Sequence, residues 1–164
     1  MITVVIGGAA SGKTQFGLSL GEGCKVRTYI ATAELHDAEM RDKAARHRLE
    51  RGDSWRTIEE PLRIADVLPQ LDGYVLVDCL TLWLSNWLLK DQCHVEAQIE
   101  QLRIALGRCA CDVALITNEV GCSVVPANSL GRTFRDVSGK MNQRIVEIAD
   151  TVHLLVAGLA LRLK

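Results

Sequence analysis

The sequence predicts an α/β fold in which a mostly parallel β-sheet is covered by helices on both faces. Short apolar stretches recur along the chain, and their length and β-branched residues are typical of buried strands. Segments with helical periodicity alternate with these stretches, as parallel strands require, because each needs a crossover connection to the next. The 164 residues contain no repeat and no linker-like tract, which predicts a single domain over residues 1–164.

The predicted strands are short apolar runs bounded by glycine, polar residues or turns. The first covers Ile2–Ile6 and ends at a pair of glycines. The other interior strands are expected at Val26–Ala31, Arg56–Ile58, Tyr74–Val77, Val113–Thr117 and Val152–Ala157. Gly158 is expected to turn the chain into a last, antiparallel edge strand that carries Leu161 and Leu163.

Helices are predicted where apolar residues recur every three or four positions. The first begins at Gly12 or Lys13 and ends near Leu20, before Gly21 and Gly23. Further helices are expected at Glu34–Arg51, Pro61–Leu68, Leu80–Leu89 and His94–Leu106. A final amphipathic helix, capped by Asn128 or Ser129, extends through Ile148.

Charge and composition exclude several classes of function. A net charge of −1 argues against a general binder of nucleic acid or of membrane surfaces, because both ligands favour a basic protein. No stretch approaches the roughly 20 apolar residues that span a bilayer. Ile2–Ile6 is too short for a signal peptide and lacks a basic lead, so we expect a cytoplasmic protein without a membrane span.

The cysteines give no sign of a metal or redox site. They form no CxxC pair, and no histidine lies at zinc-finger spacing from them. We therefore expect buried thiols that act as small apolar residues. The six are Cys24, Cys79, Cys93, Cys109, Cys111 and Cys122.

The segment after the first strand matches the phosphate-binding pattern G-x-x-x-x-G-K-[ST] at every required position. It consists of Gly7, Gly8, Ala9, Ala10, Ser11, Gly12, Lys13 and Thr14. Glycines let the backbone N–H groups point at phosphate oxygens, and the following helix adds its N-terminal dipole. Lys13 is expected to neutralise the β- and γ-phosphates of a nucleoside triphosphate, and Thr14 to bind Mg²⁺.

Asp78 is the second candidate magnesium residue. It ends the apolar run Tyr74–Val77, so its carboxylate should emerge at the carboxyl edge of the sheet, where ligands of parallel sheets bind. The alternative is an acid that only caps the helix beginning near Leu80. A Ras-like GTPase is excluded, because the segment 117–120 lacks the lysine and aspartate of the guanine-reading Asn-Lys-x-Asp motif.

His47 lies in a segment that is dense in cations. Lys43 and Arg51 are four residues away on either side, so all three share one face of the predicted helix. Nearby positive charge should keep the imidazole neutral, which is the state that a nucleophile needs. From this segment alone, an exposed histidine on a solvated basic helix is the favoured reading.

Several motifs together resemble one known family. These are the loop at 7–14, the strand end Tyr29-Ile30-Ala31-Thr32-Ala33, the run His47-x-x-x-Arg51-x-x-x-Trp55-x-Thr57-x-Glu59, Thr117-Asn118-Glu119-Val120-Gly121, Val125-Pro126-x-Asn128, Phe134-Arg135-Asp136, Asn142-Gln143-Arg144 and Ala149-Asp150. Their order is similar to that in the bifunctional adenosylcobinamide kinase/adenosylcobinamide-phosphate guanylyltransferases, a family with a RecA-like P-loop NTPase fold. The resemblance spans nearly the whole chain.

The resemblance implies two reactions. ATP or GTP phosphorylates adenosylcobinamide, and GTP then guanylylates that phosphate through a covalent guanylyl-histidine. His47 matches the nucleophile, which reverses the interpretation drawn from its segment alone. Contacts with GTP are implied for Thr32, Ala33, Glu34, Arg48, Leu49, Glu50, Arg51, Glu59 and Asp78. The family also implies a homotrimer.

Two rival functions and several roles stay open. One rival is a small-molecule P-loop kinase without nucleotidyl transfer, and the other is a non-catalytic nucleotide sensor or assembly ATPase. The preferred kinase donor, ATP or GTP, is not decided by the sequence. Four polar residues could bind substrate phosphate, lie at a subunit contact or form structural salt bridges: Asn118, Glu119, Arg132 and Arg135.

Overall fold

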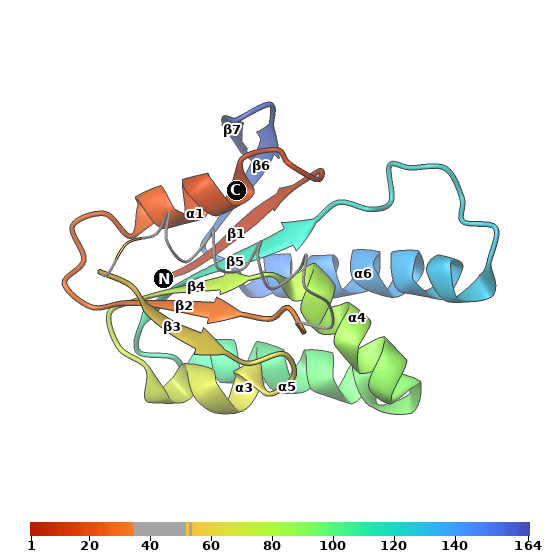
Figure 1. The fold of residues 1–164 in the computed structure, drawn as a ribbon, viewed down its shortest axis with the longest axis horizontal. Coiled ribbons are helices and arrows are strands. Elements are labelled where there is room, and N and C mark those ends of the chain that lie inside the picture. Colours follow the sequence, from red (N-terminus) through yellow and green to blue (C-terminus); the bar gives the residue numbers. More distant parts are fainter. Residues whose placement is uncertain (35–51, 53) are drawn as a thin grey trace.

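The computed structural model describes residues 1–34, 52 and 54–164. Within them, seven strands form one sheet in the order β3-β2-β4-β5-β1-β6-β7 (Figure 1). Their bounds are β1 Ile2–Gly7, β2 Arg27–Ala31, β3 Arg56–Glu59, β4 Tyr74–Asp78, β5 Asp112–Asn118, β6 Thr151–Val156 and β7 Leu159–Arg162. Neighbouring strands are parallel except for the β6–β7 pair. The prediction of a mostly parallel sheet with an antiparallel C-terminal edge is confirmed.

Helices cover both faces of this sheet, as predicted. Helix α1 (Lys13–Leu20) lies on one face (Figure 1). The opposite face carries α3 (Ile64–Val67), α4 (Leu80–Lys90), α5 (Val95–Arg108) and α6 (Ser129–Ile148). Short 3₁₀ turns at Leu68–Gln70 and Gln92–His94 follow α3 and α4. No helix among the described residues is long and apolar enough to cross a membrane.

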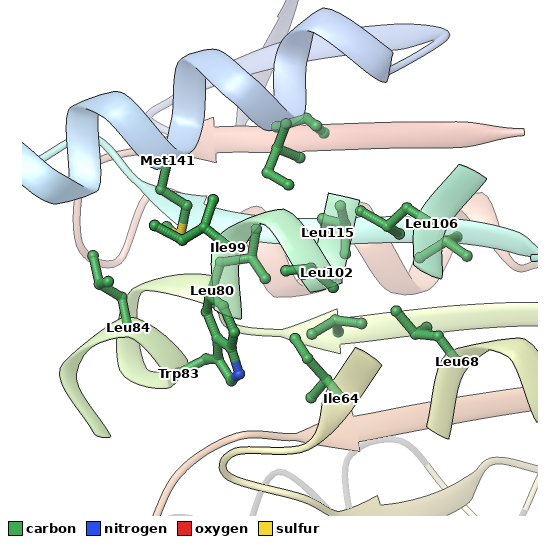
Figure 2. Packing of buried hydrophobic residues seen from close by; sticks show 14 of the residues in the cluster. Ile64, Leu68, Leu80, Trp83, Leu84, Ile99, Leu102, Leu106, Leu115 and Met141 are labelled. Atoms are coloured by element: carbon green, nitrogen blue, oxygen red, sulfur yellow. The ribbon is translucent and has the colours of Figure 1, made fainter. Parts of the chain in front are cut away.

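The larger hydrophobic core lies between the sheet and the helices α3 to α6 (Figure 2). Its fully buried side chains include Ile64, Leu68, Leu80, Trp83, Leu84, Ile99, Leu102, Leu106, Leu115 and Met141. Each such side chain stabilises the fold by about 1.5–3 kcal/mol relative to an exposed one. A smaller core on the other face packs α1 against Val5, Leu76 and Ile116.

Gly17 explains how closely α1 approaches the sheet. A Cβ atom at this position would lie 2.7 Å from Cδ1 of Leu76 and 3.5 Å from Cδ1 of Ile116. The first of these contacts is too short for a real side chain. The helix that follows the phosphate-binding loop is therefore seated directly on β4 and β5.

The segment 61–68 differs from the prediction, because the helix begins only at Ile64. The carbonyl oxygen of Pro61 accepts a hydrogen bond from Asn86 (3.0 Å), and that of Leu62 accepts bonds from the indoles of Trp83 (2.7 Å) and Trp87 (3.1 Å). Those carbonyls are bound to α4 instead of serving a helical turn.

The three tryptophans, Trp55, Trp83 and Trp87, are the few large aromatic side chains that could stack on a ring-shaped ligand, and they lie in the interior. Trp83 is 1% exposed, and Trp55 packs edge-on against Tyr74 at a centroid distance of 5.9 Å. Burial leaves neither indole face open for stacking. Trp87 is partly buried against the larger core.

The prediction of buried cysteines is right for two of them, met in part by two and wrong for two. Cys79 and Cys111 are buried, and Cys24 and Cys109 are half-buried. Cys93 and Cys122 are exposed, because the first lies in a 3₁₀ turn after α4 and the second in the loop between β5 and α6. All six are free thiols.

Ser138 on α6 provides a stability test. Its side chain is completely buried, and its hydroxyl has no hydrogen-bond partner among the described residues. A buried unpaired hydroxyl is destabilising, so Ser138→Ala should raise the free energy of unfolding by about 1 kcal/mol. For a chain of this size that corresponds to a Tm increase of about 2–4 °C in a thermal melt. The exposed Ser129 on the same helix is the control, since Ser129→Ala should leave Tm nearly unchanged.

Candidate phosphate-binding and active site

The phosphate-binding loop leaves the carboxyl end of β1 and enters α1, as its sequence predicts. Gly12 caps the helix in the left-handed conformation (φ 92°), and Ala10 is also left-handed (φ 53°). Alternation of right- and left-handed residues turns successive N–H groups toward one side, which creates an anion-binding concavity. The first helical hydrogen bond runs from Phe16 N–H to the Gly12 carbonyl (3.0 Å).

The Lys13 side chain folds back over this loop. Its ammonium donates to the carbonyl oxygen of Gly8 and lies 3.4 Å from the Ser11 hydroxyl. Only 7% of the residue is exposed, and this burial lowers the pKa of Lys13, while the nearby Cys79 and Asp78 raise it. A buried ammonium over an anion-binding loop is well placed to meet a phosphate, which would favour its charged form.

Thr14 and Asp78 meet at the mouth of the loop. The Thr14 hydroxyl donates to Oδ2 of Asp78 at 2.7 Å, although the two residues are 64 positions apart. The Tyr29 hydroxyl donates to the same oxygen at 2.9 Å. Asp78 thus points into the site instead of capping α4, which carries no side-chain cap.

The thiol beside this carboxylate is not a competing nucleophile. Burial raises the pKa of Cys79 to about 11, and Asp78 adds to the increase. The thiol therefore stays protonated at neutral pH. Its backbone instead exchanges two hydrogen bonds, each of 2.7 Å, with the Thr32 hydroxyl.

The β6–β7 hairpin packs against the phosphate-binding loop and is hydrogen-bonded to it. Its turn residues Ala157 (φ 51°) and Gly158 (φ 82°) are left-handed, as tight hairpins require. The Gly158 N–H donates to the Ser11 carbonyl at 3.0 Å. A Cβ on Gly12 would lie 3.2 Å from Gly158 Cα, and one on Gly7 would lie 2.4 Å from the Leu155 carbonyl oxygen. Glycine is needed at position 7 because the β6 backbone passes so close.

Apart from Asp78, the expected GTP-contact residues fall into four groups. Thr32 is fully buried, and its backbone and hydroxyl hold the ends of β2 and β4 together. Ala33 and Glu34 follow it at the carboxyl edge, and both are half-buried. Glu59 is exposed at the end of β3, four strand positions from β1, which at about 4.8 Å per strand is roughly 19 Å. His47 and the segment 48–51 lie outside the described residues.

The four residues with open roles behave differently from one another. The Arg132 guanidinium donates to the carbonyls of Pro126 (3.1 Å) and Ala127 (2.7 Å), and so holds its own loop. Arg135 pairs with the adjacent Asp136 at 3.1 Å. These two arginines make structural contacts. Asn118 and Glu119 lie at the carboxyl end of β5, beside β1.

Sequence reasoning missed some residues that shape the site. The sequence predicts Tyr29 only as part of a strand, but a tyrosine in a buried strand needs a hydrogen-bond partner for its hydroxyl, and this requirement is a signal of a nearby polar site. Thr81 and Asn142, which bind the backbone at the end of β5, belong to two different helices. No local signal shows that such helices converge on one strand.

The parallel sheet, the loop after β1 and the acid at the end of β4 define a P-loop nucleotide-binding protein. The fold agrees with that of a solved structure, described as a prototypical ATPase from the type III secretion system of pathogenic bacteria. The TM-score is 0.59 at 9% identity, over 98% of this chain and 56% of the other, so the likeness concerns the fold alone. Within this class, the chain belongs to the family described as cobinamide kinase / cobinamide phosphate guanyltransferase, which it matches over residues 3–163.

Full-length relatives agree with that assignment. The chain is 41% identical to the bifunctional adenosylcobalamin biosynthesis protein CobP of Pseudomonas aeruginosa, over 100% of this chain and 98% of the relative. It is 36% identical to the bifunctional adenosylcobalamin biosynthesis proteins CobU of Escherichia coli and Salmonella typhimurium, over 100% of both chains in each case. The family resemblance inferred from the motifs is confirmed.

Proposed function

We propose that this protein phosphorylates adenosylcobinamide with ATP or GTP and then transfers GMP from GTP to the new phosphate. The products of the second reaction are adenosylcobinamide-GDP and pyrophosphate. The observation that carries the proposal is the contact between the Thr14 hydroxyl and the Asp78 carboxylate at the mouth of the phosphate-binding loop. We infer from membership of the family that the acceptor of the phosphoryl group is a cobinamide.

In the kinase reaction, the loop amides and Lys13 hold the triphosphate and stabilise the charge on the transferred group. The acceptor hydroxyl oxygen of the cobinamide side chain forms a bond to the γ-phosphorus. The bond from that phosphorus to the β–γ bridging oxygen breaks, and the nucleoside diphosphate leaves. The hydroxyl proton passes to solvent or to a nearby base.

The residues at the mouth of the loop fit a magnesium ion. A threonine hydroxyl and a carboxylate oxygen are hard oxygen ligands of the kind that Mg²⁺ prefers, and they lie 2.7 Å apart. Thr14 and Asp78 would hold the ion directly or through water. When bound, magnesium supplies positive charge against the β- and γ-phosphates.

In the guanylyl transfer, His47 is the nucleophile by the family resemblance. Its ring nitrogen forms a bond to the α-phosphorus of GTP, and pyrophosphate leaves. An oxygen of the cobinamide phosphate then attacks the same phosphorus, which breaks the phosphorus–nitrogen bond and regenerates histidine. The segment Arg48–Arg51 and residues Thr32, Ala33, Glu34 and Glu59 are proposed GTP contacts. Because Glu59 lies far from β1, we assign it to the nucleoside part of the ligand.

We also propose a homotrimer that works in the cytoplasm. The trimer is inferred from the family resemblance. The cytoplasm is proposed because ATP and GTP are available there. Light scattering of the purified protein should give a mass near three times the 18.0 kDa of one chain. A mass of one or two chains would contradict the trimer.

The function is tested by following the corrinoid through both reactions. Purified protein is incubated with adenosylcobinamide and magnesium-ATP, then with GTP, and the corrinoid products are resolved by mass spectrometry. We expect a phosphate adduct first and the GDP adduct only after GTP is added. A chain that stops at the phosphate would be a kinase without nucleotidyl transfer. A chain that converts neither would be a nucleotide sensor or assembly ATPase.

A further inference from the structure

Asn118 occupies the position between the two halves of the phosphate site. Strand β5 lies between β4, which ends at Asp78, and β1, which ends at the phosphate-binding loop. Asn118 is the last residue of β5 and pairs in register with Gly7, the first residue of the loop. Its side chain therefore starts at the carboxyl edge of the sheet. The strand on one side of it leads into the phosphate-binding loop, and the strand on the other side ends at Asp78.

The backbone of Asn118 is fixed from both sides. Its N–H donates to the Thr81 hydroxyl on α4 at 2.7 Å, and its carbonyl accepts from the Asn142 amide on α6 at 3.3 Å. The next N–H, that of Glu119, donates to the Gly7 carbonyl at 3.1 Å. The point from which the Asn118 side chain leaves the backbone is thus well defined.

The side chain of Asn118 faces the phosphate-binding loop. Side chains alternate along a strand. The Thr117 hydroxyl bonds to Asn142 on α6 at 2.8 Å, whereas Ile116 packs in the cluster on the α1 face. Asn118 continues the alternation and points to the α1 face, as does Asp78, which meets Thr14 and Tyr29 there.

Asn118 has an unused hydrogen-bonding group at this position. In the part of the chain that the structure describes, no hydrogen bond or ion pair involves its carboxamide, whereas the neighbouring Thr81, Thr117 and Asn142 are all engaged. The adjacent Glu119 carboxylate is engaged, since it accepts from the Gly121 N–H at 2.6 Å. A carboxamide that leaves a fixed backbone and has no hydrogen-bond partner among the described residues is available to a ligand.

We infer that the Asn118 carboxamide donates a hydrogen bond to the phosphoryl group that a loop-bound nucleoside triphosphate transfers. Hydrogen-bond donors on several sides are needed to stabilise the negative charge on the three equatorial oxygens of this group. Lys13 and the loop amides approach from β1, and Asn118 approaches from β5 without adding charge. The inference rests on the proposed kinase activity and assigns a further catalytic residue to it.

The test compares binding of magnesium-ADP with and without aluminium fluoride, which mimics the transferred phosphoryl group. Affinities are measured by calorimetry for the wild type, Asn118→Ala and Asn118→Asp. Asn128→Ala is the matched control, since it removes a second asparagine whose side-chain oxygen caps α6. No corrinoid is required, so the result does not depend on which acceptor the enzyme uses.

We expect the wild type and Asn128→Ala to bind magnesium-ADP more tightly when aluminium fluoride is present. Asn118→Ala should bind magnesium-ADP as the wild type does but lose about 10²-fold in affinity for the fluoride complex, the effect of removing one donor to a developing charge. Asn118→Asp keeps the shape of the side chain but repels the phosphoryl oxygens, so its loss should be larger.

Three results would overturn the inference. The first is an Asn118→Ala variant whose affinity for magnesium-ADP rises as much on addition of aluminium fluoride as that of the wild type. The second is an Asn118→Ala variant that loses affinity equally for magnesium-ADP and for its fluoride complex, which would indicate a structural role. The third is a wild type without any fluoride effect. Separately, a wild type that responds to fluoride but phosphorylates no cobinamide would contradict the proposed acceptor and leave the role of Asn118 intact.

Discussion

Lys13→Ala is expected to lower the kcat of cobinamide phosphorylation by about a thousand-fold, while the protein stays folded. The substitution removes both a charge and a donor that face the transferred phosphoryl group, and loss of a single such donor costs about 10²–10³ in rate. Lys13→Arg should not restore activity. Only 7% of Lys13 is exposed and its ammonium contacts Gly8 and Ser11, so we expect the larger planar guanidinium not to be accommodated there. Single-turnover assays with labelled ATP measure the effect.

Lys140 provides the control for this experiment. It is exposed on α6, so Lys140→Ala removes the same charge from the protein without touching the loop. Its kcat should match that of the wild type, because an isolated surface charge has little effect. If Lys13→Ala retained a tenth of the wild-type kcat, Lys13 would not be the main cation on the transferred group.

His47→Ala is expected to abolish transfer of label from GTP to the protein and to leave cobinamide phosphorylation within a few-fold of the wild type. Incubation with magnesium and GTP labelled at the α-phosphate, without corrinoid, should give a wild-type adduct that survives base and is lost in acid. This stability is typical of a phosphorus–nitrogen bond to histidine. Cobinamide phosphate should then chase the label from the protein.

The exposed His94 is the matched control, since it lies in the 3₁₀ turn after α4 and pairs with Asp91 at 2.7 Å. His94→Ala should be labelled like the wild type. A His47→Ala protein that still carries label would show that another residue is the nucleophile. Absence of label on folded, GTP-binding wild type would contradict the covalent route and leave a direct transfer from GTP.

Local patterns were sufficient for most of the secondary structure. The apolar run before Gly7 and the glycine-lysine pair at its end predicted a strand, a loop and a helix, and the structure contains all three. Gly158 also indicated the final hairpin, which it forms at φ 82°. These features depend on residues close in sequence, so the sequence alone could reveal them.

The segment 61–68 shows where local patterns are insufficient. Proline at a helix start is a good local signal, yet the helix begins three residues later, because Trp83, Trp87 and Asn86 bind the carbonyls of the residues before it. The donors lie more than 20 residues away in sequence. Tertiary hydrogen bonds thus overrode a local preference of modest energy.

By itself, the sequence determined the class of fold, the phosphate-binding loop, the acid at position 78 and, through motif order, the family. The tertiary structure decided the strand order, which places β5 and then β4 beside β1. That order brings Asp78 to 2.7 Å from Thr14, adds Tyr29 to the same oxygen and puts Asn118 between the two halves of the site. The physical reason is that periodicity records which face of each strand is buried, whereas the order of strands is set by packing between segments far apart in the chain.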